Sequence, residues 1–127
     1  MRVYARKLFP HDITHEISVR TDTVREFFGG KTTGLMFVGK RSGFEGEVTI
    51  NSATDPRFGG RIKALLSDEG GATVNDILLI YKLDGDRYML EVVNQKDPRF
   101  FNLMILFRDK DRHVYLEADD EMNLIGI

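Results

Sequence analysis

The sequence predicts a mainly β domain of about eight or nine short strands with one or two short helices, closed as a barrel or a sandwich. Apolar and polar residues alternate over several short segments, and the turn at residues 84–86 (Asp-Gly-Asp) separates two of them as in a hairpin. At 127 residues the chain has the length of one domain with one hydrophobic core. We therefore expect residues 1–127 to fold as a single unit.

The N-terminal half alternates short strands with turns. Residues 2–8 suit a first strand, and residues 9–15 should end it, because their proline cannot donate to the ladder and Asp and Thr favour local turns. Residues 23–26 (Thr-Val-Arg-Glu) have the form of a capping box, which predicts a short helix over residues 24–28. Further strands are expected over residues 17–20, 35–38 and 47–50, with a turn at 40–43.

The C-terminal half contains the clearest hairpin signal. Residues 77–83 and 87–93 are two apolar segments around a short Gly-containing turn. Before them, the apolar residues 62–66 lead into a turn-rich link with room for one helical turn over residues 67–76. After them we expect a second hairpin of residues 102–107 and 113–117 around a turn at 109–111, and an edge strand at 124–127.

A long polar loop over residues 51–61 is the part of the chain most typical of a functional site. Loops of this length without secondary structure of their own are uncommon in compact domains and are often functional. Asp55 and Arg57 stand on either side of Pro56, and carboxylate and guanidinium groups read cytosine and guanine edges in DNA. The alternative is a surface loop in which Asp55 and Arg57 pair with each other. Further polar side chains in this loop are those of Asn51, Ser52 and Thr54.

The tetrapeptide at residues 55–58 (Asp-Pro-Arg-Phe) recurs at residues 97–100. A true repeat would extend the match into the flanking residues. Because the flanks do not agree, we interpret the recurrence as shared turn chemistry.

The charge of the chain is unevenly distributed. The net charge is −2, but residues 1–63 hold 11 Lys and Arg against 7 Asp and Glu, whereas residues 64–127 hold 7 against 13. This asymmetry favours an anion-binding face on an otherwise acidic domain, although chance segregation gives the same counts. The sequence has no Cys and no long apolar run, so we expect a cytoplasmic, prokaryotic-type protein that does not enter a membrane.

Sequence motifs of enzymes are weak throughout the chain. His11, Asp12 and His15 have a spacing that could suit a metal, but His113 is the only other histidine, and a closed site needs more ligands. Residues 29–32 (Gly-Gly-Lys-Thr) lack the earlier glycine of a phosphate-binding loop, and no serine lies in a nucleophile elbow. We therefore expect no catalytic residue, no metal and no cofactor.

Several of these features together resemble a known family. Residues 3–8 (Val-Tyr-Ala-Arg-Lys-Leu), followed by Asp12, His15, a short strand and a small helix, resemble the start of the N-terminal effector domain of EcoRII-type restriction endonucleases. The polar pair that enters the apolar strand at residues 75–81 fits the same family. The resemblance covers residues 3–93 and implies a DNA-binding pseudobarrel, similar to the plant B-three domain. Residues 94–127 are expected to complete the barrel.

The resemblance implies two arms that enter the major groove of double-stranded DNA: an N-arm of residues 7–15 and a C-arm of residues 51–61. It implies a short target site that includes at least one C·G pair, read by Asp55 and Arg57. Base reading is implied for Asp55, Arg57, Asn51, His15 and Thr54. Contacts to the DNA backbone, or a place in an arm, are implied for Arg6, Lys7, His11, Asp12, Lys31, Lys40, Arg41, Ser52, Arg61 and Lys63.

The resemblance also implies a division of labour, in which this domain reads the target and a fused nuclease domain lies elsewhere. By itself the chain is then not an enzyme. Two alternatives stay open: DNA binding of the transcription-factor kind with the same fold, and a β-barrel module that binds protein or carbohydrate. A hydrolase is the weakest hypothesis, because no motif supplies a site.

Overall fold

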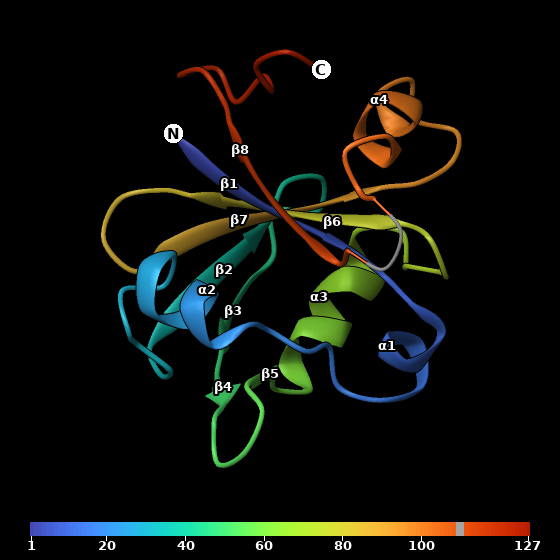
Figure 1. Cartoon of the computed structure of the whole chain (residues 1–127). Helices are drawn as coiled ribbons and strands as arrows, with labels where there is room; N and C mark the ends of the chain where they lie inside the picture. Colours follow the sequence, from blue (N-terminus) through green and yellow to red (C-terminus); the bar gives the residue numbers. More distant parts are fainter. Residues whose placement is uncertain (109–110) are drawn as a thin grey trace.

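The computed structural model describes residues 1–108 and 111–127 and contains a six-stranded sheet, a two-stranded sheet and four helices (Figure 1). The strand order of the large sheet is β3-β2-β7-β6-β1-β8. Its strands are β1 (Arg2–Lys7), β2 (Leu35–Gly39), β3 (Glu45–Val48), β6 (Ile77–Lys82), β7 (Arg87–Val93) and β8 (His113–Glu117). The small sheet pairs β4 (Ile50–Asn51) with β5 (Arg57–Phe58), and the helices are α1 (Pro10–Thr14), α2 (Thr21–Glu26), α3 (Arg61–Asp68) and α4 (Phe100–Met104).

The mainly β class predicted from the sequence is confirmed, as an open, twisted sheet of the pseudobarrel kind. β2 and β7 run parallel, and every other pair in the large sheet is antiparallel. The central strands β1 and β6 are almost continuously buried, because both faces of the sheet are covered.

Two apolar layers cover the sheet. On one face the aromatic rings of Phe27, Phe28, Phe37 and Tyr88 pack together beneath α2 and α3. On the other face α4 and the C-terminal residues cover β1 and β6, with Leu103 fully buried there. In Figure 1 α4 and both termini lie above the sheet, whereas the β4–β5 hairpin projects below it. The lower side is thus free of the chain ends.

The expected second hairpin is wrong in its first strand. Residues 100–104 form α4 instead, with Leu103 and Phe107 buried and Phe101 and Ile105 exposed. Burial therefore follows the helical period, which a continuous apolar run cannot reveal in advance. The strand at 113–117 is confirmed as β8, and the turn expected at 109–111 falls partly outside the described residues. The expected edge strand at 124–127 is reduced to one bridge, between Ala118 and Leu124.

The helices of the N-terminal half also differ from expectation. Residues 10–14 form α1, and the helix expected as one turn within residues 67–76 is α3, which instead covers the preceding apolar run and has eight residues. The helix α2 begins at Thr21, so the predicted capping residue Thr23 lies inside it, fully buried and hydrogen-bonded to the Tyr115 hydroxyl. The expected strand at 17–20 is present only as a bridge between Ser18 and Arg57. Long-range contacts to Tyr115 and Arg57 thus hold Thr23 and Ser18 in these conformations.

Replacing Asp76 with Ala should lower the free energy of unfolding by about 1 to 3 kcal/mol, because a buried carboxylate that holds the turn before β6 by two hydrogen bonds would be lost. Asp76 is 4% exposed, and its carboxylate accepts hydrogen bonds from the Thr73 backbone N–H at 2.8 Å and the Thr73 hydroxyl at 3.2 Å. Urea denaturation of the variant measures the loss, with Asp84→Ala in an exposed turn as control. Unchanged stability together with lost DNA binding would assign Asp76 to recognition instead.

Candidate nucleic-acid interface

The N-arm contains α1, which is held by a buried ion pair. The Asp12 carboxylate accepts hydrogen bonds from the Arg6 guanidinium and from the Phe9 backbone N–H, both at 2.8 Å. The side chains of Arg6 and Asp12 are both 0% exposed. Arg6 also donates to the hydroxyl and the carbonyl oxygen of Ser18, at 2.9 and 3.1 Å. The pair therefore ties α1 to β1 and to the segment that leaves the arm.

The C-arm contains the β4–β5 hairpin, which is anchored by two apolar side chains. Ile50 pairs with Phe58 across the hairpin, and these residues are 2% and 0% exposed. The Phe58 ring meets the Phe28 ring edge to face, with centroids 5.8 Å apart. Because side chains alternate along a strand, this anchoring leaves Asn51 and Arg57 pointing outward and exposed.

Backbone hydrogen bonds join the C-arm to the segment that follows the N-arm. The Val19 N–H donates to the Pro56 carbonyl oxygen, and the Phe58 N–H donates to the Ile17 carbonyl oxygen, both at 2.9 Å. The segment that follows the N-arm thus extends the small sheet of the C-arm. Both arms lie on the lower side of the sheet (Figure 1).

Asp55 and Arg57 are both exposed, and neither forms an ion pair within residues 1–108 and 111–127. The recurring tetrapeptide shows the opposite arrangement. The Asp97 carboxylate accepts hydrogen bonds from the Arg99 guanidinium at 2.7 and 3.0 Å, and Glu91 accepts another at 2.8 Å. The alternative of mutual pairing therefore describes the second tetrapeptide, whereas the first leaves its charged groups available to a ligand.

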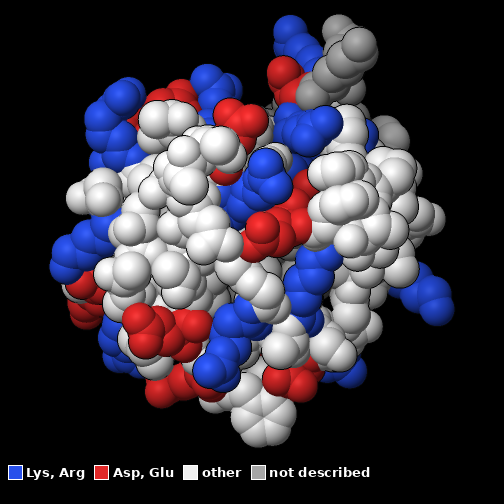
Figure 2. Space-filling model, turned by 90° about the horizontal axis from the view of Figure 1, so that it is seen from below, with Lys and Arg blue, Asp and Glu red and all other residues white. Residues whose placement is uncertain are grey.

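A groove of about 660 Å³ lies beside the tip of the C-arm. Its lining includes Arg20, Arg25, Arg112, His113 and Asp55, which come from three separate segments of the chain. Figure 2 views the molecule from this lower side and shows Lys and Arg side chains in a broken band across the face, with acidic side chains beside it. The three arginines outnumber the two acidic residues of the lining, Asp22 and Asp55, so the groove suits a polyanion.

The sequence interpretation missed the three arginines of this groove. Arg20 and Arg25 flank the start and the end of α2, and Arg112 precedes β8 with its guanidinium 4.6 Å from the centroid of the Phe9 ring. Arg112 lies far from Arg20 and Arg25 in the sequence, so only the pairing of β8 with β1 brings it beside them. The sole sequence signal was the excess of basic residues in the first half, which includes Arg20 and Arg25 but not Arg112.

His113, at the edge of the groove, is neutral at physiological pH. Burial lowers the pKa of His113 to about 4, and the nearby positive charges of Arg6, Arg20 and Arg112 act in the same direction. Its Nδ1 is hydrogen-bonded to the Tyr4 hydroxyl, whose own pKa is raised by burial. The neutral imidazole thus serves as an acceptor within the sheet rather than as a cationic DNA contact.

The free energy of unfolding should fall as the pH drops from about 6.5 to about 4. In this window the unfolded chain protonates His113 at its ordinary pKa, whereas the folded chain does not, so protons favour unfolding. Urea denaturation at several pH values measures the slope. His113→Gln keeps an acceptor for Tyr4. It should remove the part of the slope of unfolding free energy against pH that comes from one proton. The carboxylates contribute equally to the slopes of the variant and the wild type. Equal slopes for the wild type and His113→Gln would contradict the lowered pKa of His113.

The structure brings most of the predicted base-reading residues together on the arms. Asp55, Arg57 and Thr54 are exposed on the C-arm. His15 is exposed on the N-arm and stacks on His11 with ring centroids 4.0 Å apart. The Asn51 amide donates a hydrogen bond of 2.8 Å to the Glu16 carboxylate, so it links the arms in the free protein. Ser52 and Arg61 are exposed on the C-arm, and Lys7 is half-buried beside Phe9.

Three residues predicted as contacts to the DNA backbone or as arm residues are engaged within the protein. The guanidinium of Arg6 is buried, so it cannot reach a phosphate, and the carboxylate of Asp12 is turned inward against it. The ammonium of Lys63 is occupied by the carbonyl oxygens of Asp12 and Ile13, at 2.7 and 2.9 Å. In this structure all these groups make contacts within the arms or between α1 and α3. The sequence could not reveal this, because charged residues are seldom buried unless they are paired.

Three other predicted residues lie apart from the arms. Lys40 and Arg41 are in the β2–β3 turn, at the end of β3 remote from the C-arm, and the Lys40 ammonium is 3.4 Å from the Glu91 carboxylate. Lys31 follows α2 and pairs with Asp86. These three residues are not brought together with the base-reading set.

The spacing that suggested a metal at the N-arm does not yield a ligand set. His11 and His15 are on the surface, whereas the Asp12 carboxylate is buried against Arg6. Within the described ranges, no three His, Asp or Glu side chains gather as metal ligands would.

No helix in residues 1–108 and 111–127 has the length and apolar character to cross a bilayer.

Comparison with known proteins adds one informative similarity. No family model matches the sequence, and no curated protein matches it. Among solved structures, the chain is similar to the N-terminal domain of Helicobacter pylori LlaJI.R1, with a TM-score of 0.84 and 26% sequence identity. The match covers 94% of this chain and 100% of that domain, and so extends beyond the residues on which the sequence resemblance rested. In fold, the chain is therefore similar to the N-terminal domain of a restriction-modification protein over nearly its whole length.

Proposed function

We propose that this chain recognises a short sequence in double-stranded DNA, as the target-reading domain of a protein related to the EcoRII-type effector domains. The observation that carries the proposal is the similarity to the N-terminal domain of a restriction-modification protein across the whole domain. The arrangement of the arms supports it, because both face one side and carry exposed polar groups. The proposed role is recognition without cleavage, with the nuclease domain elsewhere.

In this proposal the two arms enter the major groove, where each base pair presents a distinct pattern of donors and acceptors. Asp55 accepts from a cytosine amino group, and Arg57 donates to the guanine of the same C·G pair. Thr54 and Asn51 contact neighbouring bases. Asn51 then gives up its hydrogen bond to the Glu16 carboxylate and forms one to a base instead. His15 reads from the N-arm. Pro56 lowers the cost of ordering the loop, since it fixes one backbone angle between the two readers.

Backbone phosphates are held by the arginines of the groove. Arg20, Arg25 and Arg112 lie beside Asp55, so a strand whose base contacts Asp55 has its phosphates within their reach. Arg20 is paired with Asp22 at 2.9 Å and Arg25 with Glu26 at 3.6 Å in the free protein, and both are exposed pairs of low stability. Further phosphate contacts are proposed for Lys7, His11, Ser52 and Arg61.

Arg25→Ala should weaken binding to all duplexes alike and lower the slope of log K against log salt by about one unit. Removing one phosphate contact removes the release of about one counterion, whatever the base sequence. The measurement is fluorescence anisotropy with mixed duplexes over a salt series. Lys40→Ala removes the same charge away from the arms and should leave the slope unchanged. A wild-type affinity that does not change with salt concentration would contradict DNA binding and favour a protein or carbohydrate ligand.

A further inference from the structure

The helix α1 lacks the apolar contacts that usually fix a helix on a protein. Its single buried residue is Asp12, and Ile13 is 38% exposed. Between α1 and α3 lies a pocket of about 220 Å³ with apolar walls that include Leu8, Ile17 and Leu66. The gap means that packing does not hold α1 against α3. The orientation of the N-arm therefore depends on its polar contacts.

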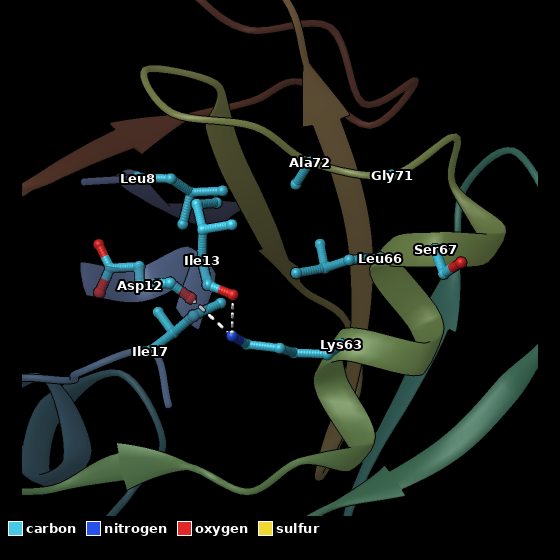
Figure 3. A pocket seen from close by; sticks show the side chains of 9 residues that line it. All are labelled: Leu8, Asp12, Ile13, Ile17, Lys63, Leu66, Ser67, Gly71 and Ala72. Atoms are coloured by element: carbon cyan, nitrogen blue, oxygen red, sulfur yellow. Dashed lines mark hydrogen bonds between the residues drawn. The ribbon is translucent and has the colours of Figure 1, made fainter. Parts of the chain in front are cut away.

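One side chain crosses this pocket. Figure 3 shows Lys63 reaching from α3 to the end of α1, where its ammonium donates to the backbone carbonyl oxygens of Asp12 and Ile13 at 2.7 and 2.9 Å. The last carbonyl groups of a helix have no partner within the helix, so a lysine that binds them fixes the position of that end. Charge-assisted hydrogen bonds of this kind are stronger than neutral ones.

The contact also connects α1 to the C-arm. Only Gly59 and Gly60 separate β5 from α3, so the helix that carries Lys63 continues directly from the hairpin. A second link, from the Asn51 amide to the Glu16 carboxylate, is exposed and uses groups that DNA can displace. Lys63 binds backbone oxygens next to the core, so it can persist in the complex.

We propose that Lys63 is a positioning residue that sets the angle of the N-arm relative to the C-arm, and through it the base preference, without touching DNA. This inference rests on the proposed function. A preset angle lowers the ordering cost of binding, since the N-arm need not be immobilised when DNA arrives. The preset angle also restricts which base the N-arm can reach once Arg57 has bound its guanine.

The test compares Lys63→Met, which keeps the aliphatic stem, with Lys63→Arg, which keeps a charged donor. In the free protein, hydrogen exchange at the amides of Asp12 and His15, which donate to Phe9 and His11 at 2.9 Å, should accelerate about ten-fold in Lys63→Met. In Lys63→Arg the same amides should keep much of the wild-type protection from hydrogen exchange. Unchanged exchange in folded Lys63→Met would overturn the inference, and this readout does not depend on DNA.

With DNA, Lys63→Met should reduce the ratio of affinities between the selected site and its single-base variants by about ten-fold at positions read by the N-arm. The slope against log salt should stay at the wild-type value, because no phosphate contact is lost. A slope lower by one unit with discrimination intact would make Lys63 a phosphate contact and overturn the inference. If wild-type protein binds no duplex while exchange still accelerates, the proposed function fails and the structural role of Lys63 stands.

Discussion

Asp12→Ala should lower the free energy of unfolding by about 3 to 5 kcal/mol, the largest loss that we expect from a single substitution in either arm. The variant leaves the Arg6 guanidinium buried with no carboxylate, and it removes the acceptor of the Phe9 N–H. An unpaired buried charge costs far more than the ion pair itself contributes. Urea denaturation monitored by circular dichroism measures the change.

Glu26→Ala is the matched control, because Glu26 pairs with Arg25 at 3.6 Å in an exposed ion pair. This substitution should change stability by less than about 1 kcal/mol. The double variant Arg6→Met with Asp12→Leu should recover part of the loss, since it buries no charge. A loss below about 1 kcal/mol for Asp12→Ala would show that the pair is open to solvent, and Arg6 would again be available to phosphate.

Arg57→Ala should cost about 1 to 3 kcal/mol on the cognate site and abolish discrimination at one base position. Arg57 is exposed beside Pro56 on a hairpin that is anchored by Phe58. Its guanidinium can therefore offer two parallel donors to a guanine with little loss of conformational entropy. The measurement is a series of dissociation constants over all single-base variants of the selected duplex. Stability should be unchanged.

Arg87→Ala is the control for this series, because Arg87 is exposed on β7 and pairs with Glu45 at 3.4 Å, outside the arms and the groove. It should leave both affinity and discrimination at wild-type values. Equal losses on every duplex variant for Arg57→Ala would demote Arg57 to a phosphate contact. The proposed reading of a C·G pair by Asp55 and Arg57 would then be wrong.

The parts of the fold that the sequence predicted are those with strong local signals. The β6–β7 hairpin has apolar strands around a Gly-containing turn, and β1 carries Val3, Tyr4 and Ala5 ahead of a break that contains a proline, so both were predicted. The helix α4 was missed because residues 100–107 are apolar except for Asn102, so neither period is visible. The helix α1 was missed because its stability comes from Arg6 on another element rather than from a stripe of its own.

The candidate site divides in the same way. Asp55 and Arg57 could be predicted, since polar residues around a proline after a strand indicate an exposed loop within one short segment. Arg112 could not be predicted, because it reaches the groove only through the pairing of β8 with β1. The buried state of Arg6 depends likewise on Asp12 and Ser18, whose placement no local pattern specifies.

The most direct test of DNA recognition is an anisotropy titration of the purified chain with a duplex selected from a random pool and with a shuffled duplex of equal composition. We predict that the selected duplex binds at least about 1,000-fold more tightly at physiological salt. We also predict that the affinity for both duplexes falls steeply as the salt concentration rises. Equal affinities for the two duplexes would contradict sequence-specific recognition, and affinities that do not change with salt would contradict DNA binding altogether.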